Sequence, residues 1–131
     1  QCSSALALAE WFGSSAGVSA VHYPGLSSHP QHGLAIKQMS AYGSMLAIEL
    51  AGGSSACRAF LGSLALARPA TSLGGPETLV CHPASSTHFG LDPDALASSA
   101  ASDGLLRISI GLENPQNLIA DFSRALTASS R

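Results

Sequence analysis

Apolar and polar residues alternate most regularly over residues 105–113. At the two-residue period of a β-strand, one face of this segment carries only aliphatic residues: Leu106, Ile108, Ile110 and Leu112. The other face carries one cation, Arg107, beside the small residues Ser109 and Gly111. The pattern predicts a strand that packs on a core and leaves a guanidinium open to an anion, for which a carboxylate is the best match. A solvated arginine or a structural ion-pair partner is the alternative that the strand alone leaves open.

Three other segments have the length and composition of strands. Residues 18–23 contain β-branched side chains and stop at the turn pair Pro24-Gly25. Residues 45–50 are almost wholly apolar and predict a largely buried strand, and residues 78–82 predict a short strand ahead of a proline.

Apolar residues recur at three- and four-residue spacing in three further segments, which predicts helices with one face on a sheet. The first helix is expected to begin at a cap from Ser3 or Ser4 and to stop at Gly13. The second is expected to follow a cap from Ser54 or Ser55.

The last helix has the clearest start. Asn114 is expected as its cap and Pro115 as its first-turn residue. Its apolar stripe consists of Leu118, Ile119, Phe122 and Leu126. Asp121 and Arg124 are expected on the outer, solvent-facing side.

The order of these elements indicates the fold class. Two shorter helices are expected over about 28–39, with Ser28 as the cap, and over about 92–98. Short strands and short helices thus alternate along the chain and are joined by brief connections. The sequence contains no internal repeat. This order predicts an α+β domain with a small, mainly antiparallel sheet that helices cover on one face. The 131 residues suffice for one domain with a core of its own.

Composition indicates a surface that is partly covered. Hydrophobic residues make up 46% of the chain and charged residues only 11%, whereas about a quarter of residues are charged in typical small domains. The chain begins with Gln1 and not with methionine, so we expect a piece of a longer protein.

Charge and hydropathy argue against nucleic-acid-binding, membrane-spanning and secreted proteins. A net charge of −2 without a basic run gives no electrostatic footprint for nucleic acid. No segment approaches the length of an apolar membrane span, and the N-terminus lacks the basic start of a signal peptide. We therefore expect a cytoplasmic protein without membrane contact.

The sequence gives no expectation of a metal site, a phosphate loop or an activated serine. The three cysteines, Cys2, Cys57 and Cys81, lie far apart and predict reduced, buried thiols. The five histidines lack metal-ligand spacing, so no metal site is expected. Residues 13–17 match the letters of GxSxG, but they follow a predicted helix, so no strand-to-helix nucleophile elbow is expected. Gly74-Gly75 lacks the spacing of a phosphate loop. The only lysine, Lys37, is expected to be an exposed helical residue, with a cofactor-binding amine as the alternative.

Five segments together resemble the C-terminal domain of a known family. They are residues 21–32, 38–50, 71–79, 82–88 and 104–113. The resemblance is to the Cys/Met-metabolism (transsulfuration) family of pyridoxal-phosphate (PLP) enzymes, which includes cystathionine γ-synthase, cystathionine lyases, methionine γ-lyase and homoserine-ester sulfhydrylases. It implies that residues 1–131 form a single C-terminal substrate-binding domain of a fold-type I PLP-dependent enzyme. Residues 1–17 would be the end of the connecting helix, and the large PLP-binding domain would be absent.

The resemblance also implies residue roles. Arg107, in the family's LxRxSxGxE strand, would clamp the α-carboxylate of an amino acid substrate. Ser72 would be part of the same pocket with Leu73 beside it, and Thr87 would line the substrate site. No catalytic residue is implied, because the family's lysine lies in an upstream Ser-x-Thr-Lys motif that Lys37 does not match. We therefore expect the isolated chain to be inactive, although the complete enzyme would use PLP and form a homotetramer.

One departure from the family pattern bears on the substrate. Thr71 stands where cystathionine-handling members often have a glutamate, which favours methionine-like or homoserine-ester substrates. Two alternatives from other classes remain. One is a non-catalytic carboxylate- or amino acid-binding module, and the other is an assembly module from a truncated or split gene.

Overall fold

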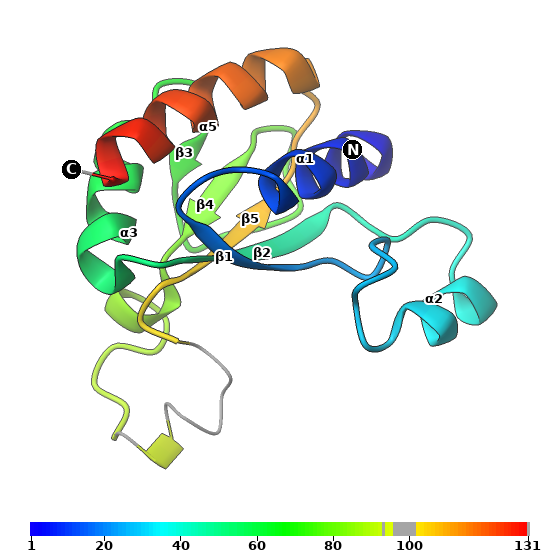
Figure 1. Cartoon of the computed structure of the whole chain (residues 1–131), viewed down its shortest axis with the longest axis horizontal. Helices are drawn as coiled ribbons and strands as arrows, with labels where there is room; N and C mark the ends of the chain where they lie inside the picture. Colours follow the sequence, from blue (N-terminus) through cyan, green and yellow to red (C-terminus); the bar gives the residue numbers. More distant parts are fainter. Residues whose placement is uncertain (93, 96–101, 131) are drawn as a thin grey trace.

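The computed structural model describes residues 1–92, 94–95 and 102–130. In chain order the elements are α1 (Cys2–Gly13), β1 (Val18–His22), α2 (His32–Gln38), β2 (Met45–Leu50), α3 (Gly53–Gly62), β3 (Arg68–Pro69), β4 (Leu79–Cys81), the 3₁₀ helix η1 (Pro83–Ser85), β5 (Leu105–Ser109) and α5 (Pro115–Ser129) (Figure 1). The helix expected over 92–98 falls largely outside the described residues. No helix in the described part of the chain is long and apolar enough to cross a membrane.

The sheet has the strand order β1-β2-β5-β4-β3. Every pairing is antiparallel except that of β3 with β4, so the predicted mainly antiparallel sheet is confirmed. The parallel strand β3 was not expected from the sequence. With only Arg68 and Pro69 it is too short to show a period. Its pairing consists of a hydrogen bond from the Arg68 amide to the carbonyl of Thr78, just before β4, and one from the amide of Ala70, just after β3, to the carbonyl of Val80.

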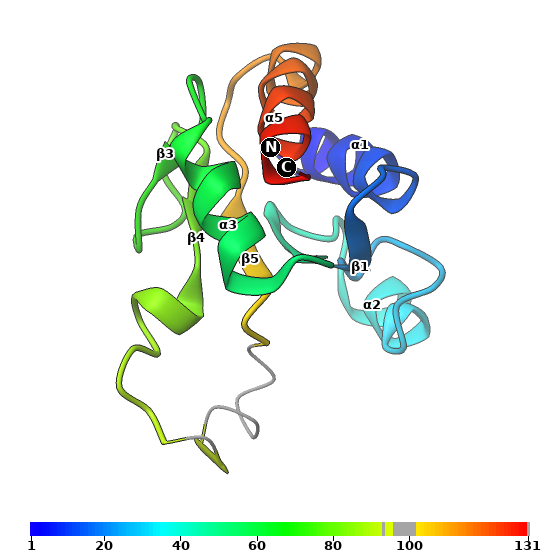
Figure 2. The ribbon, with the colours of Figure 1, turned by 60° about the vertical axis from the view of Figure 1, so that its left-hand side comes forward.

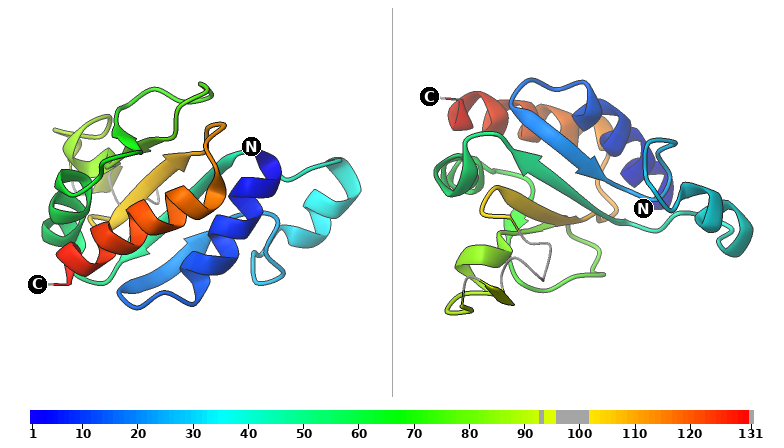
Figure 3. Two further views of the ribbon diagram at one scale, coloured as in Figure 1. Left: turned by 90° about the horizontal axis from the view of Figure 1, so that it is seen from above. Right: turned by 60° about the horizontal axis from the view of Figure 1, so that its bottom comes forward.

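Helices α1, α3 and α5 cover one face of the sheet (Figures 2 and 3), as predicted. Their aromatic rings meet in the centre of the core. The ring of Phe122 on α5 lies 5.3 Å from that of Phe12 on α1 and 5.9 Å from that of Phe60 on α3. All three rings are fully buried, together with Leu106 and Ile108 of β5. Helix α2 lies apart from this layer, to one side of the sheet (Figure 1).

The alternation predicted for β5 is correct up to its end. Leu106, Ile108 and Ile110 are fully buried, but Leu112 is 71% exposed, so its predicted place in the core is wrong. The strand ends at Ser109 and the chain then turns toward α5, so the two-residue period no longer holds at position 112.

Three helix starts differ from prediction. Helices α1, α2 and α3 begin at Cys2, His32 and Gly53, and none receives a side-chain capping bond, so the predicted serine caps are wrong. At α3 the Ser54 hydroxyl donates to the carbonyl of Asp103 instead (3.1 Å).

The predicted start of α5 is confirmed. Asn114 lies at the N-cap, and its side-chain oxygen accepts a hydrogen bond of 2.9 Å from the amide of Gln116. Pro115 is the first helical residue, where its missing N–H costs no hydrogen bond.

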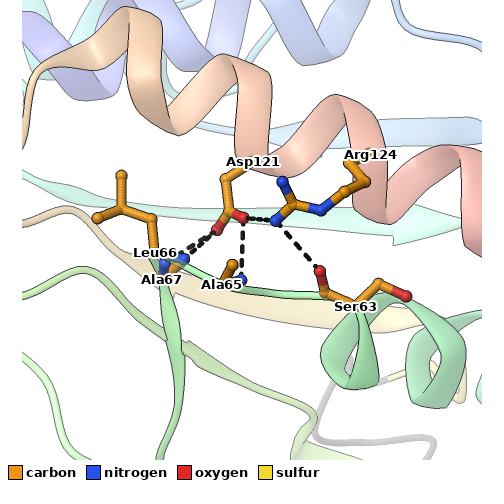
Figure 4. Close-up of polar contacts among 6 residues, drawn as sticks. All are labelled: Ser63, Ala65, Leu66, Ala67, Asp121 and Arg124. Carbon is orange, nitrogen blue, oxygen red and sulfur yellow. Dashed lines mark hydrogen bonds and ion pairs between the residues drawn. The ribbon is translucent and has the colours of Figure 1, made fainter.

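Asp121 is buried, contrary to prediction (Figure 4). Its carboxylate accepts hydrogen bonds from the amides of Ala65 (2.9 Å), Leu66 (3.0 Å) and Ala67 (2.9 Å) and pairs with Arg124. Its partners are backbone groups far away in sequence, which a helical pattern does not reveal. The carboxylate fixes the connection between α3 and β3 on the surface of α5.

The cysteines are free thiols. Cys57 and Cys81 are buried, whereas Cys2 is only half-buried. Burial, with a smaller contribution from the nearby Asp103 carboxylate, raises the pKa of Cys57 to about 11, so this thiol stays protonated at neutral pH.

Candidate functional site

Strand β5 holds Arg107 on the sheet face opposite the helices, because its neighbours in sequence point into the core. Its partners on the adjacent strands are Ala47 of β2 and Cys81 of β4. Both side chains are small, so neither fills the space beside the guanidinium. The prediction that Arg107 lies on the face away from the core is confirmed.

The loop between β3 and β4 orients this arginine. The Nη2 group of Arg107 donates to the carbonyls of Thr71 (2.7 Å) and Ser72 (3.1 Å). Its Nε–H is buried and has no hydrogen-bond partner within the described residues. A buried donor of this kind is costly to leave unpaired, so it indicates a missing acceptor. The guanidinium of Arg107 is thus fixed in place and still has an unused hydrogen-bond donor, its Nε–H.

The same loop is tied to β5 and the residues that follow it at successive positions. The amide of Gly74 donates to Ser109 Oγ (2.9 Å), and the amide of Leu112 donates to the carbonyl of Pro76 (2.8 Å). Gly111 lies where the loop comes closest, since a Cβ there would collide with the Pro76 carbonyl oxygen and lie 2.6 Å from the carbonyl carbon of Glu77. Only glycine allows this approach.

Glu113 completes the attachment. Its carboxylate accepts from the amide of Thr78 (2.6 Å) and from the Thr78 hydroxyl (2.7 Å), while that hydroxyl accepts from the amide of Gly111 (2.9 Å). No role was expected for Ser109 or Glu113. The available signal was that they lie two and six residues after Arg107, in step with the period of the strand.

The other predicted site residues lie in two places. Ser72 and Leu73 belong to the loop on Arg107, where Ser72 offers its carbonyl and Leu73 is 55% exposed. Thr87 follows η1, is exposed, and forms its hydroxyl hydrogen bond with Nδ1 of the adjacent His88 (2.9 Å). Within the described residues, no hydrogen bond joins Thr87 to Arg107.

Few groups near Arg107 could transfer protons. His82 comes directly after β4, but its Nδ1 is bonded to Ser85 Oγ (2.8 Å) and its Nε2 to the Asp103 carbonyl (2.8 Å). Lys37 is exposed on α2, apart from the sheet (Figure 1). No group of three metal-ligating side chains is present in the described ranges. The arrangement can therefore bind and orient a carboxylate.

Known proteins match this chain over almost its whole length. L-methionine γ-lyase of Pseudomonas putida is 46% identical over 129 residues, which are 98% of this chain and 32% of that protein. O-succinylhomoserine sulfhydrylase of Pseudomonas aeruginosa is 40% identical over 125 residues, 95% of this chain and 31% of that protein.

The fold also matches solved structures. The crystal structure of cystathionine γ-synthase from Xanthomonas oryzae pv. oryzae in complex with aminoacrylate and cysteine has a TM-score of 0.92 at 43% identity, covering 98% of this chain and 33% of that one. The crystal structure of cystathionine γ-lyase from Micromonospora echinospora has a TM-score of 0.89 at 40% identity, and the match covers 96% of this chain and 33% of that one. Both matches confirm the predicted fold of a C-terminal domain in a fold-type I PLP enzyme.

The chain spans about a third of the length of the curated relatives it matches. The family model described as Cys/Met metabolism PLP-dependent enzyme matches residues 1–127. This chain therefore belongs to the Cys/Met-metabolism family of PLP-dependent enzymes.

Proposed function

We propose that this chain is the C-terminal, substrate-carboxylate-binding domain of a PLP-dependent enzyme that acts on a sulfur amino acid by β- or γ-elimination or replacement. Membership of the family supports the cofactor, and the names of the relatives support the reaction class. Residues 1–131 would form this single domain, with residues 1–17 as the end of a connecting helix. A homotetramer and a cytoplasmic location stay predictions.

The observation that carries the proposal is the state of Arg107. Two loop carbonyls fix its Nη2 group, while its buried Nε–H has no partner in the described part of the chain. A carboxylate accepts hydrogen bonds and carries the opposite charge, so it satisfies this donor better than a neutral group does. The Xanthomonas structure reported above contains cysteine, and a second crystal structure of that enzyme contains cystathionine. Both amino acids carry an α-carboxylate.

The residues of this chain fit one task in catalysis, which is to bind and orient the substrate. PLP, when bound, supplies an electron sink for bonds at the substrate Cα. Arg107 would hold the α-carboxylate and so orient the bonds at Cα, and the loop carrying Ser72 and Leu73 would form one wall of the pocket. Exposed Lys37, away from the sheet, does not fit the attachment point of a cofactor. We infer that PLP is held by another part of the protein.

Replacing Arg107 with alanine tests the proposal in a protein that carries this chain together with a complete PLP-binding domain. We expect kcat/KM for L-methionine or O-succinyl-L-homoserine to fall roughly 10- to 150-fold, because about 1.5–3 kcal/mol of charge-assisted hydrogen bonding is lost. Arg107→Lys should recover little, since an ammonium cannot reproduce the planar fork. PLP absorbance should stay unchanged.

Arg58→Ala is the matched control, because Arg58 is an exposed arginine on α3. It should leave kcat/KM within about twofold, as expected for a surface position. A wild-type kcat/KM for Arg107→Ala would refute the carboxylate role and favour a structural or assembly module.

The isolated 131-residue chain should have no PLP chemistry of its own. After incubation with equimolar PLP and borohydride reduction, mass spectrometry should find Lys37 labelled no more than Nα-acetyl-lysine at the same concentration. The physical reason is that the surroundings of an exposed lysine do not make its amine more reactive toward an aldehyde than a free amine. Selective, stoichiometric labelling of Lys37 would show instead that this chain is a minimal PLP protein.

A further inference from the structure

Ser109 is the only buried serine in the described residues, with 1% of its surface exposed. It lies on β5 two residues after Arg107 and points to the same face of the sheet. Its hydroxyl oxygen accepts a hydrogen bond of 2.9 Å from the amide of Gly74. Gly74 has a φ of +77°, so the loop turns sharply at the point where Ser109 holds it.

The loop has few other attachments at this point. Thr71 and Ser72 are held through their carbonyls by Arg107 itself, and Leu73 is 55% exposed and packs little. The next hydrogen bonds come after Gly74. The Gly75 carbonyl accepts from Gln1 Nε2 (3.0 Å), and the Pro76 carbonyl accepts from the amide of Leu112. Without the Ser109 bond, residues 71–74 would keep hydrogen bonds only to Arg107 within the described part of the chain, which is the residue that they orient.

The direction of support follows from this arrangement. A buried hydroxyl on a central strand is a rigid anchor, whereas a long arginine side chain loses considerable rotamer freedom when it is fixed. Ser109 therefore fixes the loop, the loop carbonyls fix Nη2 of Arg107, and the remaining donors of Arg107 keep a constant direction. Loss of the hydrogen bond between Ser109 and Gly74 should therefore make the Arg107 guanidinium less well oriented.

We propose that Ser109 is a positioning residue of the carboxylate site, which acts through the amide of Gly74 on the loop carbonyls that orient Arg107. The proposal rests on the function proposed above for Arg107. It concerns how accurately the site is built and not which group binds the substrate.

The first test uses the ¹H–¹⁵N NMR spectrum of the 131-residue chain. In Ser109→Ala, we expect hydrogen exchange at the Gly74 amide to become about 2- to 10-fold faster, as follows from the loss of one neutral hydrogen bond, and the Arg107 Nε–H resonance to shift. Ser109→Cys retains a weak acceptor and should give an intermediate result. Ser15→Ala, which removes a hydroxyl bond to the Trp11 carbonyl (2.8 Å) in α1, should change neither signal.

The second test measures KM and kcat separately in the protein that also carries the PLP-binding domain, with L-methionine and O-succinyl-L-homoserine as probes. Ser109→Ala should raise KM by about 2- to 10-fold with kcat within about twofold, and Ser109→Cys should recover part of the loss. If the Arg107 resonance and KM stay at wild-type values while Gly74 exchanges faster, Ser109 only anchors the loop and the inference is wrong. If Arg107→Ala also leaves KM unchanged, the proposed carboxylate site itself is wrong.

Discussion

Replacing Asp121 with alanine should lower the free energy of unfolding of this chain by about 3–5 kcal/mol. The carboxylate accepts from three backbone amides on the connection between α3 and β3, and only 3% of its side chain is exposed. The substitution leaves these amides without their acceptor, and the bond from Ala67 is buried, so water replaces it poorly there. Urea unfolding followed by circular dichroism at pH 7 measures the loss.

Two related variants separate the hydrogen bonds from the ion pair. Asp121→Asn keeps one oxygen acceptor and should cost clearly less than alanine. Arg124→Ala should cost about 1 kcal/mol or less, because the guanidinium is 55% exposed and its pairing is weakened by water. Equal losses for Arg124→Ala and Asp121→Ala would show that the ion pair, and not the amide cradle, stabilises this connection.

The same carboxylate gives the stability a defined pH dependence. Burial raises the pKa of Asp121, but hydrogen bonds from the amides of Ala67, Ala65 and Leu66, with the charge of Arg124, outweigh burial and hold that pKa below its usual value. A group with a lowered pKa in the folded state stabilises the fold above the unfolded-state pKa of about 3.9. That stabilisation is lost as the pH falls through the folded-state pKa. Asp121→Asn should therefore flatten the acid side of the stability curve.

Phe122→Ala should destabilise the chain by about 3–5 kcal/mol, the range for a fully buried phenylalanine. Its ring is 0% exposed and joins the rings of Phe12 and Phe60 between three helices. The truncation opens a cavity that these helices can close only in part. Thermal unfolding of the 131-residue chain should show a large decrease in Tm.

Phe89→Ala is the matched control, since it deletes the same ring at a position that is 80% exposed. It should change the free energy of unfolding by no more than about 0.5 kcal/mol. A similar loss for both variants would mean that Phe122 does not have the buried packing described above.

The sequence predicted the elements whose signals are local. Strand β2 has its predicted bounds, and α5 begins at the predicted cap and proline because both act within one turn of helix. The buried Asp121 and the strand β3 could not be predicted, because their partners are backbone groups 54 to 56 residues away or on a neighbouring strand. A side chain that binds backbone leaves no complementary residue in the sequence.

The candidate site shows the same division. Alternation along β5 was enough to single out Arg107 and to place it on the face away from the core. The acceptors that orient it are carbonyls of Thr71 and Ser72, and every residue has a carbonyl, so this contact has no sequence signature. The roles of Ser72, Leu73 and Thr87 toward a substrate stay predictions.

The central strand of the sheet is also the last strand in the described part of the chain. β5 lies between β2 and β4, so it alone joins the β1–β2 pair to the β3–β4 pair. During translation these two pairs leave the ribosome with open edges and cannot be united until residues 105–109 have emerged. A message cut short before this point yields two unjoined fragments of sheet prone to edge pairing between chains. The cationic site thus exists only in molecules whose sheet is complete.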